Sequence, residues 1–227
     1  MNQPLVSPSW KAAYPGACVG ILVMQDVTNP ADCPPLDEHK AALEAQLRAR
    51  FQGQDRTAIR ALPTLAAYAT YYKRFRKTYH VQLQLESVAL KGKPIPRVAA
   101  LVEAMFVSEL QNLLLTAGHD LDKVKDPVQI EVSDGSESYL RINGQEQQLK
   151  KGDMYIRDAE GILSSIIYGP DHRTQIAEET RNVLFTVYAP PGIDEPAVLA
   201  HLQDICNNVH LIAPQAQVVL IETYRAK

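Results

Sequence analysis

Apolar residues follow two spacings along the chain, one typical of strands and one of helices. Continuous apolar runs at residues 17–24 and 183–188 predict buried strands. Apolar residues three or four positions apart predict helices over residues 38–51, 65–78 and 97–117. The third helical pattern is the longest in the chain, and the residue after it is a glycine, which suits a helix C-terminus.

The second half of the chain alternates apolar and polar residues, which is typical of strands. The alternation holds between residues 128 and 156, and Asn143-Gly144 within it suits a hairpin turn. Asp194 stands at the N-cap position of a last helix, and residues 217–223 predict a closing strand. We therefore expect an α+β fold with antiparallel or mixed sheets flanked by helices.

A dense polar loop follows the structure-breaking dipeptide Gly169-Pro170. Its ionisable and hydroxyl side chains are Asp171, His172, Arg173 and Thr174. An apolar run ending at Tyr168 leads into this loop, and a strand is a rigid support for a functional loop. A solvated turn would give the same local pattern.

The densest group of basic residues lies at the end of the second predicted helix. We call the following four residues the basic cluster: Lys73, Arg74, Arg76 and Lys77. Aromatic residues are interleaved with these cations, among them Tyr72 and Phe75. Cations beside exposed rings can hold a phosphate backbone and stack a base. A helix that buries its rings and solvates its cations gives the same pattern.

Two further ionisable residues accompany the longest helical pattern. Glu103 falls within its apolar part, where a carboxylate is either solvated at the edge of the face or drawn inward to meet a cation. His119 follows the predicted helix directly and is either a base or a turn residue.

Composition narrows the class of protein. The 227 residues are 46% hydrophobic and 22% charged, with a net charge of −3, so the chain as a whole is not a basic nucleic-acid coat. Its three cysteines and six histidines show no metal-ligand spacing, and the cysteines fit reduced thiols in a cytosolic protein. Neither a signal peptide nor an apolar run of about 18 residues is present. Nucleotide-binding and common hydrolase motifs are also absent.

Several motifs resemble the B3/B4 domain of the phenylalanyl-tRNA synthetase β-subunit. Residues 119–123, His-Asp-Leu-Asp-Lys, resemble the D-L-D-K motif of that domain, and residues 96–103 resemble the segment before it. Residues 143–161 and 176–183 are similar to later segments of the domain. Upstream, Trp10, Tyr14-Pro15-Gly16 and residues 71–75 resemble free-standing members of the family.

The resemblance implies a B3/B4-like fold and an editing activity. It implies a single domain over residues 1–227, with an N-terminal extension to residue 92 that carries the basic helix. Residues 93–190 would form the core motif region, and residues 191–227 a C-terminal helix and strand. In the synthetase, this domain hosts the site that hydrolyses mischarged aminoacyl-tRNA.

The chain departs from the synthetase pattern at two positions. A histidine shortly before the D-L-D-K motif corresponds to Ala117 here, and His119 is offset from it. The Gly-Gly-Glu loop that reads a tyrosine hydroxyl corresponds to residues 171–174. These departures predict a pocket that is kept and a specificity that has changed.

The resemblance gives roles to the residues singled out above. The predicted catalytic residues are His172 and His119, which would orient water, and Arg173 and Thr174, which would stabilise the oxyanion. The predicted substrate-binding residues are Glu103, Asp158, Asp171 and Tyr168. Three of these are carboxylates, which favour a cationic, arginine-like amino acid, and some free-standing relatives act as canavanyl-tRNA deacylases. The predicted tRNA contacts are Tyr72, Lys73, Arg74, Arg76 and Lys77.

Three functions stay open at this point. The first is a trans-acting deacylase of mischarged aminoacyl-tRNA, acting in the cytoplasm without a cofactor or metal, and with tRNA as its partner in place of DNA or a membrane. The second is a tRNA- or RNA-binding module without catalysis. The third is a protein that binds or transforms a free amino-acid derivative. The sequence predicts neither the amino acid, nor the tRNA, nor the oligomeric state.

Overall fold

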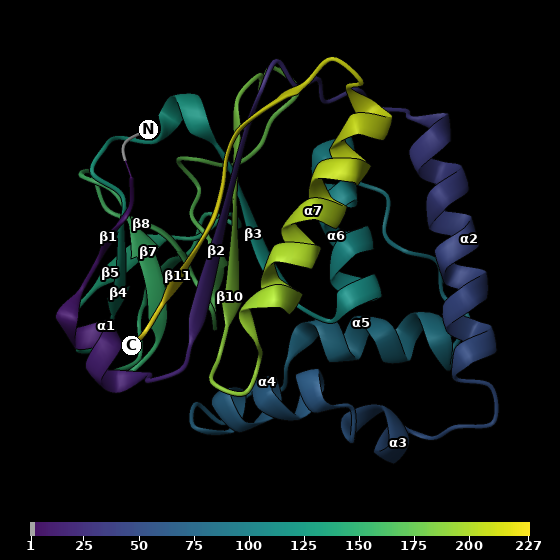
Figure 1. Cartoon of the computed structure of the whole chain (residues 1–227), viewed down its shortest axis with the longest axis horizontal. Coiled ribbons are helices and arrows are strands. Elements are labelled where there is room, and N and C mark those ends of the chain that lie inside the picture. The colour runs from purple at the N-terminus through teal and green to yellow at the C-terminus, as the bar shows by residue number, and fades with distance from the viewer. Residues whose placement is uncertain (1–2) are drawn as a thin grey trace.

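A four-stranded antiparallel sheet lies at the centre of the computed structural model, which describes residues 3–227 (Figure 1). Its strand order is β11-β2-β10-β3. The strands are β2 (Cys18–Gln25), β3 (Leu115–Asp120), β10 (Val183–Ala189) and β11 (Gln217–Arg225). Strands from the start, middle and end of the chain therefore share one sheet.

A second, five-stranded sheet lies beside the first, on the side away from the long helices (Figure 1). Its strands, in spatial order, are β1 (Leu5–Val6), β4 (Gln129–Val132), β7 (Met154–Arg157), β8 (Ile162–Ser165) and β9 (Gly169–Pro170). Only the β1–β4 pair is parallel within the part of the chain described, so the sheet is mixed. The predicted Asn143-Gly144 hairpin joins β5 (Ser138–Leu140) to β6 (Glu146–Gln148).

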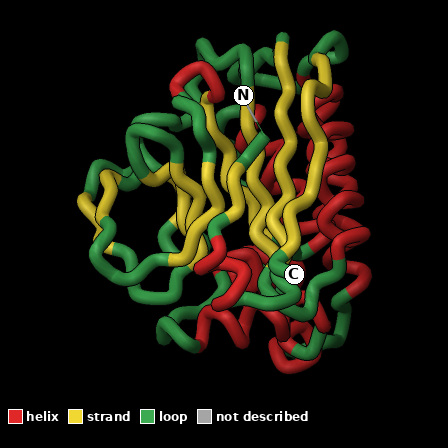
Figure 2. The backbone as a smooth tube through the Cα atoms, turned by 60° about the vertical axis from the view of Figure 1, so that its left-hand side comes forward, coloured by secondary structure: helices red, strands yellow, loops and turns green. Residues whose placement is uncertain are grey.

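Helices cover the other face of the four-stranded sheet in two layers (Figures 1 and 2). The inner layer consists of α6 (Ala100–Asn112) and α7 (Glu195–Ile212), and α2 (Pro34–Arg50) lies outside it. Three helices run across one end of the sheet: α3 (Arg56–Arg60), α4 (Pro63–Lys73) and α5 (His80–Ala89). The shortest helices are α1 (Pro8–Ala13) and the 3-10 helix η1 (Leu121–Lys123).

The packing of α7 on β2 depends on a glycine. Gly20 lies in the middle of β2, and a Cβ built there would come 2.6 Å from Val198 and 3.0 Å from Leu202 of α7. Such distances are shorter than van der Waals contact, so only a residue without a side chain lets the helix lie this close. The predicted N-cap of this helix is confirmed, because the Asp194 carboxylate accepts a hydrogen bond from the Ala197 N–H (3.1 Å).

The longest predicted helix is shorter than its apolar pattern. α6 ends at Asn112, Leu113 adopts a left-handed conformation (φ 62°), and β3 begins at Leu115. Tyr68 of α4 and Tyr79, the N-cap residue of α5, hold this change of direction. The Tyr79 hydroxyl donates to the Leu113 carbonyl (3.2 Å), and the Leu115 N–H donates to the Tyr68 hydroxyl (2.8 Å). The prediction of a helix to residue 117 is therefore wrong.

The other predicted boundaries differ by similar amounts. The helix expected from residue 38 begins at Pro34, and the one expected to reach residue 78 ends at Lys73. The separate helix α5 was not predicted. None of the helices within residues 3–227 combines the length and the apolar character needed to cross a bilayer.

Candidate functional site

The polar loop at residues 171–174 is a tightly hydrogen-bonded turn. Both carboxylate oxygens of Asp171 accept from the Thr174 N–H (3.3 Å), and the Thr174 hydroxyl donates to Asp171 Oδ1. Asp171 and Thr174 are buried, whereas His172 is exposed. Burial raises the pKa of Asp171, and the hydrogen bonds from Thr174 oppose that rise. Residues 171–174 therefore form a hydrogen-bonded turn, and His172 is its one exposed side chain.

His119 lies inside the molecule and not in a turn after a helix. It is a residue of β3, is fully buried, and contacts Thr174 Oγ1 through Nδ1 (2.8 Å) and Ser164 Oγ through Nε2 (3.1 Å). Because the Thr174 hydrogen is donated to Asp171, Nδ1 carries the imidazole proton and Nε2 accepts from Ser164. Burial lowers the pKa of His119 to about 3, so the ring is neutral.

These contacts form a chain of buried hydrogen bonds that we call the relay. It runs from Asp171 through Thr174, His119 and Ser164 to the Tyr188 hydroxyl, which lies 2.7 Å from Ser164 Oγ. Each of its five side chains is at least nine-tenths buried. The relay therefore fixes side-chain positions, and His119 has no exposed atom with which to orient bulk water.

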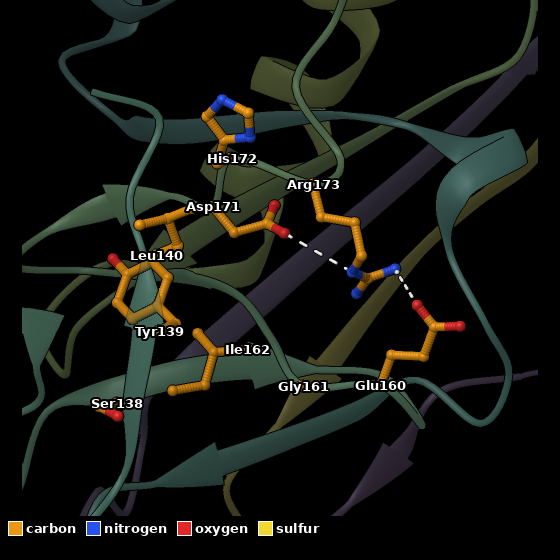
Figure 3. A pocket seen from close by; sticks show the side chains of 9 residues that line it. All are labelled: Ser138, Tyr139, Leu140, Glu160, Gly161, Ile162, Asp171, His172 and Arg173. Atoms are coloured by element: carbon orange, nitrogen blue, oxygen red, sulfur yellow. Dashed lines mark ion pairs between the residues drawn. The ribbon is translucent and has the colours of Figure 1, made fainter. Parts of the chain in front are cut away.

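Arg173 connects the polar loop to the turn at residues 158–161 (Figure 3). One terminal nitrogen of its guanidinium lies 2.8 Å from each oxygen of Asp158, and another lies 3.3 Å from Glu160. Its Nε lies 3.8 Å from Asp171. Asp158 also accepts backbone N–H groups of Lys125 (2.8 Å) and of its own turn. Arg173 and Asp158 are therefore bound to each other and to neighbouring backbone.

A cavity of about 250 Å³ opens beside this pair, and we call it the loop cavity. It is lined by Ser138, Tyr139, Leu140, Glu160, Gly161, Ile162, Asp171, His172 and Arg173. Figure 3 shows Asp171 pointing toward Arg173, and His172 directed away from that pair. Of the predicted catalytic residues, His172 and Arg173 thus line a cavity directly, while His119 and Thr174 lie behind it.

Glu103 does not join the other two predicted carboxylates. It forms a buried ion pair with Lys40 of α2 and accepts the Val98 N–H (2.7 Å). Of the two alternatives for this residue, the inward one that meets a cation is therefore correct. The prediction that Glu103 would share a pocket with Asp158 and Asp171 is wrong, because Glu103 ties α2 to α6 and only the other two share Arg173.

The basic cluster is exposed, and the aromatic rings between its cations are not. All four cations are exposed, whereas Tyr72 is 2% exposed and donates its hydroxyl to the Ile166 carbonyl (2.7 Å). Tyr72 is thus a core residue and cannot stack a base at the surface, which corrects its predicted role. The Lys77 ammonium lies 4.6 Å from the ring centre of Tyr168, so the cluster borders the segment that leads into the polar loop.

A second cavity, of about 260 Å³, lies between α6, β3 and β9, and we call it the α6–β3 cavity. Its apolar wall consists of Val102, Met105, Phe106, Leu115, Ala117, Ile142, Pro170 and Ile176. Its polar side chains are His80, Glu109, Thr116, Ser165 and Tyr188, and the backbone of Gly118 and Gly169 completes it. Tyr188, the last residue of the relay, lines this cavity, so the relay connects it with the loop cavity.

Glu109 is the residue of this cavity that the sequence reasoning missed. It is 1% exposed, and its Oε1 accepts the Thr116 N–H (2.8 Å). Burial raises its pKa to about 8. Glu109 lies four residues after Met105 and seven after Val102, so the helical spacing that marks the apolar face also places this carboxyl on it.

Residues 66–198, which include every residue of both cavities, match the family model described as the B3/4 domain. The match covers more than half of the chain, and the chain belongs to the B3/4 domain family.

Two relatives illustrate the relationship. The phenylalanine–tRNA ligase beta subunit of Mycoplasma pneumoniae is 28% identical over 69 residues, which is 30% of this chain and 9% of the ligase subunit. An N-terminal fragment of the phenylalanyl-tRNA synthetase beta-subunit from Pyrococcus horikoshii superposes with a TM-score of 0.50 at 13% identity. That superposition covers 95% of this chain and 50% of the fragment. The expected α+β fold of B3/B4 type is thus confirmed, and the chain spans half or less of either relative.

Proposed function

We propose that this protein is a trans-acting aminoacyl-tRNA deacylase, and that the aminoacyl end of its substrate enters the α6–β3 cavity. The observation that supports this proposal is an enclosed, mostly apolar cavity with a few polar side chains, inside the region that matches the B3/4 domain. Its volume of about 260 Å³ suits one amino-acid side chain and not a nucleotide.

The tRNA would be held by the basic cluster. Lys77 lies over Tyr168, and the next two residues, Gly169 and Pro170, line the α6–β3 cavity. A phosphate backbone bound by the cluster would therefore end beside the cavity mouth. Contacts to phosphates carry no sequence information, so the basic cluster needs no base-specific readout to hold the tRNA.

The proposed reaction is hydrolysis of the ester between the amino acid and the terminal ribose. A water oxygen attacks the carbonyl carbon, the ester C–O bond breaks, and the ribose oxygen takes up a proton. His172 lines the loop cavity and not the α6–β3 cavity that takes the aminoacyl end, so we assign the proton transfer to a ribose hydroxyl of the substrate. His119 and Thr174 act as positioning residues because they are buried in the relay. Arg173 is held by Asp158, and the N–H groups of Asp171, His172 and Thr174 already donate to protein acceptors, so we assign no oxyanion donor within the loop.

We propose that the amino acid on the substrate tRNA has a cationic, arginine-like side chain. An arginine-like side chain such as that of canavanine was expected from three carboxylates. Glu103 and Asp158 are bound to Lys40 and Arg173, and Asp171 accepts from Thr174. Glu109 is the carboxyl that supports this substrate class better. We also place the activity in the cytoplasm, where aminoacyl-tRNA is used.

A non-catalytic tRNA-binding module is the second candidate. The burial of His119 and Thr174 favours it, because two of the four predicted catalytic residues cannot contact a substrate directly. Both candidate functions use the basic cluster to bind tRNA, and only the deacylase hydrolyses the aminoacyl ester.

A deacylation panel separates the two functions. Purified protein is mixed with a set of mischarged and correctly charged tRNAs, and release of labelled amino acid is followed with time. We expect accelerated release from at least one mischarged tRNA. Flat time courses for every tRNA, together with measurable tRNA binding, would establish the binding module instead.

A further inference from the structure

One carboxyl oxygen in the α6–β3 cavity has no hydrogen-bond partner among residues 3–227. Among the buried side-chain nitrogen and oxygen atoms that line this cavity, Glu109 Oε2 is the one without a hydrogen bond to any residue in 3–227. Its neighbour Oε1 is held by the Thr116 N–H. A buried polar atom without a partner costs free energy, so it points to a ligand that completes the site.

The other polar side chains of the cavity already have partners. Thr116 Oγ1 lies 2.7 Å from His201 Nε2, and the Tyr188 hydroxyl lies 2.7 Å from Ser164 Oγ. Ser165 Oγ accepts the Tyr168 N–H (3.0 Å), and His80 Nδ1 lies 3.3 Å from the Tyr72 hydroxyl. Glu109 therefore differs from them in having an oxygen available to a bound molecule.

Glu109 has no cationic partner among residues 3–227. The residues within 3–227 form no ion pair with it, in contrast to Glu103, which lies on the same helix α6 and pairs with Lys40 of α2. The walls around it are the apolar side chains of Val102, Met105 and Phe106. A mostly apolar cavity with one unpaired acceptor among its described lining atoms is complementary to a methylene stem that ends in a positively charged nitrogen.

A second buried carboxyl provides a comparison. Asp153 is fully buried, its Oδ2 also lacks a hydrogen bond to any described residue, and its Oδ1 accepts from the Tyr71 hydroxyl (2.8 Å). Asp153 lines none of the cavities described above. An unpaired buried oxygen alone therefore does not indicate a binding site. Glu109 differs from Asp153 because its unpaired oxygen belongs to a residue that lines a cavity.

We infer that Glu109 is the specificity-determining residue of the α6–β3 cavity, and that its Oε2 accepts a hydrogen bond from the cationic end of an amino-acid side chain. The inference deepens the proposed function and rests on it, since the aminoacyl end must enter this cavity. A side chain of the same length with a methyl end would fill the cavity and leave Oε2 unpaired. Such an unpaired group is the basis on which sites reject close analogues.

Binding of amino-acid amides tests the inference without any reaction. Calorimetry compares argininamide and lysinamide with norleucinamide, which keeps the methylene stem and lacks the cation, on the wild type, Glu109→Gln and Asp153→Asn. Glutamine keeps the shape of glutamate and removes its charge. We expect the wild type to favour the cationic amides by on the order of 10- to 100-fold, the range for a charged hydrogen bond. Glu109→Gln should remove this preference, and Asp153→Asn should keep it.

The inference is overturned by any of three results: equal affinity of the wild type for norleucinamide and lysinamide, an undiminished preference in Glu109→Gln, or no binding of any amide. Deacylation of arginyl-, lysyl- and methionyl-tRNA by the same variants separates the inference from the proposed function. Cationic preference in binding with no release from any tRNA contradicts the deacylase and not the role of Glu109. Release from neutral aminoacyl-tRNA that Glu109→Gln leaves unchanged contradicts the role of Glu109 and not the deacylase.

Discussion

Glu103 and Glu109 are buried on the same helix and have opposite electrostatic surroundings. Glu103 meets the Lys40 ammonium and the Val98 N–H, so both of its oxygens have partners. Glu109 has one backbone N–H and apolar neighbours. The first residue therefore contributes an ion pair between helices, and the second is a carboxyl that favours its neutral form.

The titration of Glu109 predicts how stability changes with pH. Its pKa is raised from 4.5 to about 8 in the folded protein, so the folded state binds more protons than the unfolded state between these values. Stability must then fall as pH rises through this window, by up to about 1.4 kcal/mol per pH unit. We expect the free energy of unfolding of the wild type, relative to Glu109→Gln, to decrease from pH 5 to pH 8 in urea titrations.

The comparison with the glutamine variant isolates this residue. Asp153 has its pKa raised to about 7, while His119 and His201 have theirs lowered to about 3, and all three contribute equally to both proteins. Parallel stability curves for the two proteins would show that Glu109 is ionised in the folded state.

The sequence does not predict which side chains of the site contact each other. The loop at 171–174 was recognisable from its polar residues, and its place at the wall of a pocket was expected only from the family resemblance. That Asp158 would pair with Arg173, and that Thr174 would bind His119, depends on strands distant in sequence. Contacts between residues far apart in the chain leave no local pattern in the sequence. The sequence therefore indicated the residues of the site but not which of them contact each other.

At the scale of elements, β2 and α7 pack closely because Gly20 has no side chain. Among the described glycines, Gly20 is the one where an added Cβ would come nearest to another atom. Gly20→Ala would place a Cβ 2.6 Å from Val198 Cγ1 and 3.0 Å from Leu202 Cδ1. Overpacking of a filled core typically costs about 1–3 kcal/mol. We expect the variant to unfold at lower urea concentration by an amount in this range.

A second substitution checks the cause. Val198→Ala removes the nearest atom, so Gly20→Ala should cost less in the Val198→Ala background than in the wild type. Equal costs in both backgrounds would assign the effect to the strand itself and not to the helix that packs on it.

The end of α6 shows where periodicity fails as a guide. Residues 113–117 continue the apolar pattern of the helix, and they carry no glycine, proline or asparagine to stop it. The chain turns because Tyr68 and Tyr79 bind the backbone on either side of Leu114. By contrast β2 and β10 begin and end near their predicted positions, and α7 begins where the Asp194 N-cap predicts, since apolar runs and local capping define these boundaries.

At the scale of the whole molecule, net charge and local charge differ. The chain carries a net charge of −3, yet the basic cluster places four exposed cations within five residues. A polyanion would therefore bind at one region of the surface and be repelled elsewhere.

Salt dependence measures this contact. Replacing Lys73 and Arg76 with alanine removes two phosphate contacts, which should reduce the slope of log affinity against log salt by about 1.4–1.8. Filter binding of tRNA over a range of salt concentrations gives the slope. As a matched control, alanine at the exposed Lys91 and Lys93 should leave it unchanged. Equal slopes for the wild type and the Lys73, Arg76 variant would place the tRNA on another surface.

The fold class and the family could be predicted from the sequence, and the principal cavity could not. The α+β class follows from alternating patterns, and the B3/B4 resemblance from motifs such as residues 119–123. The α6–β3 cavity is assembled from α5, α6, β3, β8, β9, β10 and two loop residues. Glu109 becomes a site residue only when these elements come together.

The position of β2 between β10 and β11 has a consequence for how the protein is made. β2 is synthesised first of the three, and its residues 18–24 are buried on both faces. During translation it has no partner until residues 183–189 leave the ribosome, and one edge stays unpaired until residues 217–225 follow. An unpaired apolar edge invites association with other chains. The nascent chain would therefore need a chaperone or fast final pairing to reach its folded state.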